Sequence, residues 1–282
     1  MDYHWFPGHM AKTIRQIKED IKLIDLVIEV LDSRIPRSSM NPILNEIAKN
    51  KPRLIIMNKS DMSEKLYNEK WEKYFISKGY HVVLTDAKNK KGIKNIYDKA
   101  IEACSDIIER NIRRGLKNKT IKAMVFGIPN TGKSTIINAI SGKNVTKTGN
   151  TPGVTRGKQW IRLGKNIELL DTPGVLWHKF EDMEVGKKIA FIGSIKNEVV
   201  IIEELAYDLL TWLSQNKQDY LVDKYDIIIN DPLEALEKIA QKRGCLLKGA
   251  KLDLTRASNL FLEEFRNAKL GRITLDREIC DE

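Results

Sequence analysis

A glycine-rich stretch near the middle of the chain has the residue types and the spacing of a phosphate-binding loop. Residues 127–134 read Gly-Ile-Pro-Asn-Thr-Gly-Lys-Ser, between an apolar run at 123–126 that predicts a buried strand and the apolar periodicity of a helix. In such a unit, backbone N–H groups and the positive end of the helix dipole bind phosphate oxygens. Lys133 is expected to reach the β- and γ-phosphates, and the Ser134 hydroxyl to bind Mg²⁺. The predicted phosphate-binding set is completed by Asn130, Thr131, Gly132 and Thr135.

A second motif, Asn58-Lys59-Ser60-Asp61, follows a predicted strand at 53–57 and suits a loop that reads a guanine base. A carboxylate such as Asp61 can accept hydrogen bonds from both the N1–H and the 2-amino group of guanine. Adenine has neither donor there, and an unpaired buried carboxylate would reject it. Asn58 is expected to orient the loop and meet the purine edge, and the Lys59 stem to cover the ring face.

Two further motifs also follow predicted strands. The strand at 81–84 ends in Thr-Asp-Ala-Lys, where Asp86 and Ala87 are assigned to the base site and the Ala87 N–H to guanine O6. The strand at 166–170 ends in Asp-Thr-Pro-Gly, where Asp171 would contact Mg²⁺ through water and the Gly174 N–H would sense the γ-phosphate. In the loop 151–157, Thr155 is the candidate for a contact to the metal and the nucleophile; a plain loop threonine is the alternative.

The elements that must position these motifs alternate between strand and helix. Apolar runs predict strands at 24–32, 53–57, 81–84, 123–126, 159–163 and 166–170. Amphipathic periodicity predicts a helix at 9–22, and further helices are expected at 41–49, 64–78 and 92–109. Such alternation is typical of an α/β fold with a mostly parallel sheet, whose sites lie at the carboxyl ends of the strands. We therefore expect residues 1–179 to form one α/β domain that carries all of these motifs.

Residues 180–282 are predicted to form a separate, smaller, all-α domain. Asp231-Pro232 and Asp253 have the residue types that begin helices, and Gly244 one that ends them. From 242 to 272 the basic residues outnumber the acidic ones by eight to three, which favours phosphate contacts to folded RNA over a merely solvated basic face. The basic residues are Lys242, Arg243, Lys248, Lys251, Arg256, Arg266, Lys269 and Arg272.

Composition agrees with a nucleic-acid partner. The 282 residues include 48 Lys and Arg against 38 Asp and Glu, a net charge of +10, although a merely basic protein is the alternative. No apolar run approaches the roughly 20 residues of a membrane helix, and no signal peptide is recognised. The three cysteines are far apart and indicate neither a disulfide framework nor a zinc site, which fits a reducing cytoplasm.

The order of the motifs along the chain is unusual. Regulatory GTPases run phosphate-binding loop, switch threonine, DxxG, NKxD and then an SAK-like loop, whereas here NKSD and TDAK come first. The sheet is therefore expected to be circularly permuted, with the connector 110–121 joining the usual termini. This arrangement resembles the circularly permuted GTPases of ribosome assembly, most of all the ribosome biogenesis GTPase A (YlqF/RbgA) family. The resemblance rests on WFPGHM, DSRIP, NKSD, GIPNTGKS, NTPGVTR, DTPG and LLKGAKLDLTRASNLFLEEFRNAKLGRITLD, with TDAK departing slightly from SAK.

The permutation also bears on the attacking water. Val175 follows the DTPG glycine, where many GTPases have a water-orienting glutamine, and valine has no hydrogen-bonding group. Helix 9–22 is expected where the switch-II helix normally lies, with its start beside Gly174. His9 is then the candidate catalytic group, because a neutral imidazole can orient or deprotonate water, and the resemblance implies the same histidine. The alternatives are that His9 only caps its helix or that His178 takes the role.

The resemblance further implies what the protein acts on. It implies a GTPase that binds GTP and GDP with Mg²⁺, binds the maturing large (50S) ribosomal subunit and its rRNA, and uses hydrolysis to gate its release. It also implies K⁺ stimulation through Asn130, because an asparagine here helps potassium-activated GTPases to bind K⁺. A monomer off the ribosome is expected. Two other functions stay open: a GTP-dependent RNA-binding placeholder with incidental hydrolysis, and a signalling GTPase with a protein effector.

Overall fold

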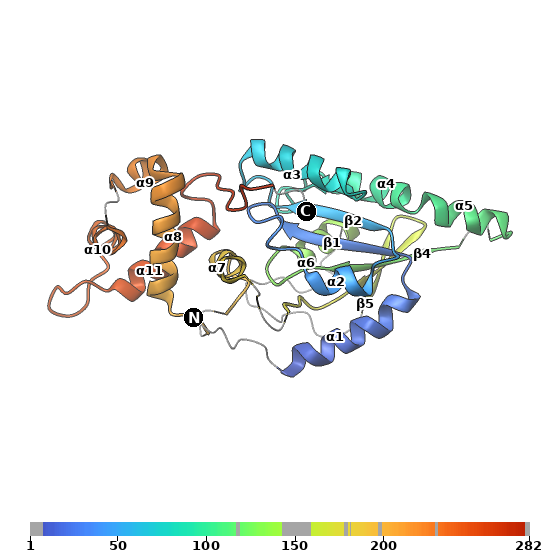
Figure 1. The fold of residues 1–282 in the computed structure, drawn as a ribbon, viewed down its shortest axis with the longest axis horizontal. Helices are drawn as coiled ribbons and strands as arrows, with labels where there is room; N and C mark the ends of the chain where they lie inside the picture. Colours follow the sequence, from blue (N-terminus) through green and yellow to red (C-terminus); the bar gives the residue numbers. More distant parts are fainter. Residues whose placement is uncertain are drawn as a thin grey trace. The chain divides into compact units, whose positions relative to one another are not determined.

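The structure, a computed structural model, describes residues 8–116, 119–142, 159–177, 180, 182–196, 199–228 and 231–279. They belong to two compact units. Phe6–Phe180 and Thr274–Glu282 form the first, which we call the sheet unit, and Glu181–Ile273 is the main part of the second, which we call the helical unit. Figure 1 shows the elements of each unit.

The sheet unit contains a six-stranded sheet in the order β3-β2-β1-β4-β6-β5. All neighbouring strands are parallel except the edge strand β5, which runs antiparallel to β6. This confirms the predicted α/β fold with a mostly parallel sheet, and the strand order places the two permuted halves side by side. The strands are β1 (Leu26–Asp32), β2 (Arg53–Asn58), β3 (His81–Leu84), β4 (Ile121–Phe126), β5 (Gln159–Leu163) and β6 (Ile167–Asp171).

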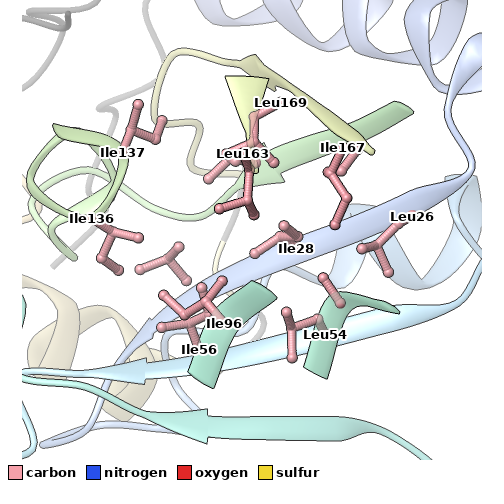
Figure 2. Close-up of a cluster of buried hydrophobic side chains, with 14 of the residues drawn as sticks. Leu26, Ile28, Leu54, Ile56, Ile96, Ile136, Ile137, Leu163, Ile167 and Leu169 are labelled. Atoms are coloured by element: carbon pink, nitrogen blue, oxygen red, sulfur yellow. The ribbon is translucent and has the colours of Figure 1, made fainter. Parts of the chain in front are cut away.

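Side chains of alternate direction along the strands form a core on each face of the sheet. On one face Leu26, Ile28 and Val30 of β1 pack with side chains of β4, β6 and two helices, α4 (Ile93–Ala103) and α6 (Lys133–Ser141) (Figure 2). On the other face Val27 packs with Ile17 of α1 (Gly8–Asp20), Leu44 of α2 (Pro42–Ile47) and residues of β4. The central strands are therefore buried on both sides, as their continuous apolar runs predict.

The helices of the sheet unit follow the sequence prediction closely. They are α1 (Gly8–Asp20, followed by a 3₁₀ turn at Ile21–Leu23), α2 (Pro42–Ile47), α3 (Lys65–Ser77), α4 (Ile93–Ala103), α5 (Ser105–Arg113) and α6 (Lys133–Ser141). The single helix predicted at 92–109 is two helices, because Cys104 leaves helical geometry (φ −103°, ψ 10°) and its N–H bonds to the Ile101 carbonyl instead.

The helical unit consists, in its described part, of α7 (Met183–Phe191), α8 (Ile202–Asn216), α9 (Gln218–Tyr225), α10 (Pro232–Lys242) and α11 (Leu254–Arg266). The two predicted caps are present: the Asp231 carboxylate accepts from the Leu233 N–H at 2.9 Å, and that of Asp253 from the Arg256 N–H at 2.9 Å. Phe261 and Phe265 of α11 are buried, so the helix presents the expected apolar face to the core of this unit.

The end of the chain does not belong to the helical unit. Sequence patterns assigned all of 180–282 to the helical domain, but Thr274–Ile279 packs on the sheet unit, where Leu275 and Asp276 are buried. The apolar Leu275 and the paired polar groups around it account for this return. Across the described ranges, none of the helices has the length and hydropathy that a membrane crossing requires.

Candidate nucleotide site

The parallel strands bring the sequence motifs to one edge of the sheet. In the strand register Asp32 lies opposite Asn58, and Asp171 lies opposite Val125. The DSRIP, NKSD, TDAK, GIPNTGKS and DTPG segments therefore all leave the sheet at its carboxyl-terminal edge, where ligands of open α/β sheets bind.

Asn58 joins three of these loops. Its side-chain amide donates to the Thr131 carbonyl of the phosphate-binding loop at 2.8 Å. Its side-chain oxygen accepts from the Thr85 hydroxyl at 3.0 Å and from the Ala87 N–H at 3.2 Å. Asn58 is buried, so each lost partner would leave an unpaired polar group in the interior. It therefore fixes the base-site loops against the phosphate-binding loop.

Lys59 continues this connection through a buried carboxylate. Its ammonium lies 2.9 Å from Asp32 and donates to the Asn130 carbonyl at 2.6 Å. The Arg34 guanidinium binds the same carboxylate through both oxygens, at 2.9 and 2.8 Å. Burial acts to raise the pKa of Asp32, but the charges of Arg34 and Lys59 outweigh it and hold that pKa well below its usual range. Asp32 is thus a charged anchor for the NKSD loop.

The phosphate-binding loop has the backbone that its glycines permit. Gly132 has φ +98°, and a Cβ there would lie 2.2 Å from the Asn58 amide nitrogen. Gly127 has φ +154°, and a Cβ there would lie 2.5 Å from the Val30 carbonyl oxygen. Both positions therefore need glycine for close approach as well as for dihedral freedom. Helix α6 begins directly after Gly132, with Ser134 and Thr135 in its first turn.

Lys133 is buried and points into this loop. Its ammonium donates to the carbonyls of Gly127 and Ile128 at 3.0 and 2.8 Å, so one of its three donors stays available for a phosphate oxygen. Burial lowers the pKa of Lys133 to about 8, against the opposing charge of Asp171. Gly174 packs on the same loop, since a Cβ there would lie 2.9 Å from the Lys133 ammonium.

Asp171 has the environment of a carboxylate that contacts a metal through water. It is buried, and neither of its oxygens has a hydrogen-bond partner within the described residues. Burial raises the pKa of Asp171 to about 6, with the Lys133 charge acting against it. A hydrated Mg²⁺ held also by Ser134 would satisfy both oxygens, so the residues present fit that ion.

The residue after the DTPG glycine points into the core. Val175 is fully buried beside Ile17 of α1, so helix 9–22 shares a core with the end of this motif. The Val175 carbonyl accepts from the Asn41 side chain at 2.9 Å, and Asn41 also caps α2 through the Ile43 N–H at 3.0 Å. Asn41 therefore anchors the DTPG segment to α2.

The other predicted base-site residues are placed as follows. Ser60 donates through its N–H and its hydroxyl to the Thr85 carbonyl, both at 3.0 Å. Asp61 is partly exposed on the loop that follows. The Asp86 carboxylate accepts from the N–H and the side chain of Asn89, so it shapes the turn after β3. The Ala87 N–H is bonded to Asn58, and its donation to guanine O6 stays a prediction.

Several predicted residues lie outside the described part of the chain. Thr155 and His178 are among them, as is the side chain of His9, whose backbone lies in the first turn of α1. Their roles stay predictions, and so does K⁺ binding by Asn130, which has a left-handed backbone with φ +62°.

Two anchoring residues are not predicted by the motifs. Asp32 and Asn41 had no assigned role, although Asp32 sits at the end of a buried strand beside the NKSD strand. An acidic residue at the end of β1 is a usable signal, because the neighbouring strand β2 leads directly into Lys59, whose charge it can pair with. Asn41 carried a weaker signal, its place directly before Pro42 at the start of a helix.

The predicted RNA-binding residues of the helical unit divide into two groups. Three are engaged inside the unit: Lys242 donates to the Tyr225 carbonyl, Arg243 pairs with the buried Glu264 at 2.5 Å, and Arg266 donates to the carbonyls of Ala190 and Phe191. The other five are exposed and form no ion pair among the described residues: Lys248, Lys251, Arg256, Lys269 and Arg272.

Comparisons with known proteins agree with this geometry. Residues 122–243 match the family described as 50S ribosome-binding GTPase. The chain is 41% identical to ribosome biogenesis GTPase A of Bacillus cereus over 98% of its length and 94% of that protein's. For the same protein of Priestia megaterium the identity is 42%, covering 98% and 97%.

A solved structure is also similar. GNP-bound YlqF from T. maritima superposes with a TM-score of 0.67 at 27% identity, covering 94% of this chain and 98% of that one. Its likeness spans both units rather than the phosphate-binding loop alone. With curated relatives matched over nearly their full length, the chain belongs to the ribosome biogenesis GTPase A family, and it is a guanine-nucleotide-binding, circularly permuted GTPase.

Proposed function

We propose that this ribosome-biogenesis GTPase binds the maturing large ribosomal subunit through rRNA contacts of the helical unit and uses GTP hydrolysis to gate its release. The observation that carries the proposal is the set of exposed cations on α11 and the loops beside it, in a chain of this family. Exposed lysines and arginines without intramolecular partners are free to neutralise phosphates.

Two of these cations lie on an exposed loop. Leu246 and Leu252 form a bridge, and the Leu247 N–H donates to the Lys251 carbonyl at 2.8 Å, so the loop between α10 and α11 folds back on itself. Lys248 and Lys251 are exposed there, and Leu247 is 54% exposed beside them. A tip with both charges and an apolar side chain suits the backbone and the splayed bases of folded RNA.

We assign the nucleotide site as follows. Asp61 accepts from the guanine edge, Asn58 holds the base loops in place, and Lys133 and the α6 N-terminus bind the phosphates. Ser134 and Asp171 would hold Mg²⁺, the second through water, and the bound ion neutralises phosphate charge. Gly174 would sense the γ-phosphate through its N–H.

Hydrolysis needs a group that orients water, and the buried Val175 has none to offer. We assign this role to His9, at the start of α1. We assign the contact to the metal and the nucleophile to Thr155, in the loop 151–157. Replacing His9 with alanine should lower GTP turnover and spare nucleotide affinity; an unchanged kcat would remove the assignment.

Asn130 is proposed as a K⁺ contact, and the protein as a cytoplasmic monomer when off the ribosome. GTP turnover with purified large-subunit particles, in K⁺ and in Na⁺, tests the main proposal. Acceleration by the particles supports it. A GTP-dependent RNA-binding placeholder predicts no acceleration, and a signalling GTPase predicts no co-sedimentation with subunits. Equal rates in the two salts would remove the K⁺ site.

A further inference from the structure

The C-terminal segment Thr274–Ile279 is anchored to the sheet unit by buried polar contacts. Its centre is Asp276, which is 4% exposed. The Asp276 carboxylate accepts from the N–H and the hydroxyl of Ser38, both at 2.8 Å. The backbone carbonyl of Asp276 accepts from the Trp71 indole N–H at 2.9 Å. Burying a carboxylate is costly unless it is hydrogen-bonded, and here both donors are supplied by the sheet unit. The segment is therefore an integral part of this unit.

One set of contacts leads from the segment to Asp32, the carboxylate that anchors Lys59. The Leu275 N–H donates to the Arg34 carbonyl at 2.8 Å. Arg34 in turn binds the Asp32 carboxylate that holds the Lys59 ammonium against the phosphate-binding loop. Ser38, the partner of Asp276, lies on the same loop after β1. The segment therefore fixes the loop after β1 that carries Arg34, beside Asp32 at the end of that strand.

A second set leads to the other end of the NKSD loop. Thr274 and Glu64 are paired twice: the Glu64 N–H donates to the Thr274 hydroxyl at 3.1 Å, and the Thr274 N–H donates to the Glu64 carboxylate at 3.2 Å. The Arg277 guanidinium binds Glu64 at 2.9 Å as well. Glu64 precedes α3, three residues after Asp61, so the segment holds the exit of the loop that carries the guanine-reading carboxylate.

We infer that Thr274–Ile279 is a positioning element of the guanine-base site. It holds the site from one side through the ion pairs that join Arg34, Asp32 and Lys59, and from the other side through Glu64. The inference rests on the base site proposed above and assigns it a new set of determinants. The chain enters this segment directly from the helical unit, between Ile273 and Thr274. Displacement of the segment would therefore loosen the loops that hold the guanine base.

The test is the rate at which fluorescently labelled GDP leaves the full-length protein. Asp276→Ala removes the acceptor of both Ser38 bonds, and Glu278→Ala, an exposed change in the same segment, is the matched control. We expect release about tenfold faster from Asp276→Ala, the scale of one lost charge-assisted hydrogen bond, and an unchanged rate from Glu278→Ala. The rate is measured at a temperature where circular dichroism shows each variant folded.

A purely structural role would lower the melting temperature of Asp276→Ala but leave GDP release at the wild-type rate, and that result would overturn the inference. Faster release from Glu278→Ala would overturn it too. Should Asp276→Ala not fold, Ser38→Ala decides, because it removes only the hydroxyl donor and is expected to speed release severalfold. A wild type that binds ADP as well as GDP would instead refute the guanine site itself.

Discussion

The side chain of Asn58 donates to the Thr131 carbonyl at 2.8 Å, so the NKSD loop is bonded directly to a phosphate-binding loop that follows it by 73 residues. In the usual motif order the two loops come in the opposite sequence. The bond shows how the permuted chain closes one site: parallel strands bring both loops to the same edge, and a buried amide joins them. The glycine at 132 permits that approach.

Removing this junction should weaken nucleotide binding. Asn58→Ala leaves the Thr131 carbonyl, the Thr85 hydroxyl and the Ala87 N–H without their partner. We expect the Kd for GDP to rise roughly tenfold to a hundredfold, on the scale of one or two lost buried hydrogen bonds. Isothermal titration calorimetry measures this, with Asn95→Ala on the exposed side of α4 as control. Equal GDP affinity of wild type and Asn58→Ala would show that the junction is dispensable.

Asp32→Asn should destabilise the fold by about 3–5 kcal/mol at neutral pH, since it leaves the Arg34 and Lys59 charges without a buried partner. Because the folded pKa of Asp32 lies below its unfolded value of about 3.9, the carboxylate contributes stability above that pH and loses it as pH falls through the folded pKa.

Urea unfolding of both proteins across pH checks this sign. The difference in unfolding free energy between wild type and Asp32→Asn should be constant above about pH 5 and become smaller only below about pH 4. A gap that narrows on going from pH 5 to pH 8 would contradict the assignment of Asp32 as the charged anchor.

Sequence patterns foresaw most of the sheet unit because its elements are long or strongly apolar. The predicted strand at 53–57 agrees with β2, Arg53–Asn58, within one residue. Its run of buried apolar side chains can be recognised from the local sequence alone. The break at Cys104 was missed because no glycine or proline marks it. The permutation followed from motif order alone.

The remaining features depend on tertiary contacts that leave no local signal. Charge counting predicts Arg243 to be an RNA-binding cation, yet it pairs with Glu264 twenty-one residues away. Asp276 was part of a tail assigned to the helical domain, and its partner Ser38 lies 238 residues away. Charge counts along a sequence cannot separate a cation that is paired inside the fold from one that is free.

GDP binding should take up protons near pH 8. The pKa of Lys133 is lowered to about 8 by burial, and a phosphate beside the ammonium will raise it again. At pH 8 part of the lysine is therefore neutral before binding and charged after it. Titration calorimetry in two buffers of different ionisation enthalpy, HEPES and Tris, measures the uptake. Lys133→Arg, charged at every pH used, is the control and should show none. Absence of uptake by the wild type would contradict a phosphate contact of Lys133.

The two groups of cations in the helical unit should separate in experiment. Arg243→Ala leaves the carboxylate of Glu264 buried without its ion pair, so the melting temperature should fall. The double charge reversal Lys248→Glu/Lys251→Glu should leave the melting temperature unchanged and weaken binding to large-subunit particles, with a smaller salt dependence. Sedimentation with the particles at two salt concentrations checks this; unchanged binding by the charge-reversal variant would place the RNA contact elsewhere.

The most direct test of the guanine site is the base preference of Asp61→Asn. In xanthine an oxygen replaces the 2-amino group, so an asparagine amide can donate where the aspartate had to accept. Wild type should bind GDP at least roughly a hundredfold tighter than xanthosine diphosphate, the scale of discrimination by a site built for hydrogen bonds. Asp61→Asn should reverse that order when both Kd values are measured by calorimetry. If Asp61→Asn keeps the wild-type affinity for GDP and still rejects xanthosine diphosphate, the NKSD loop does not read the base.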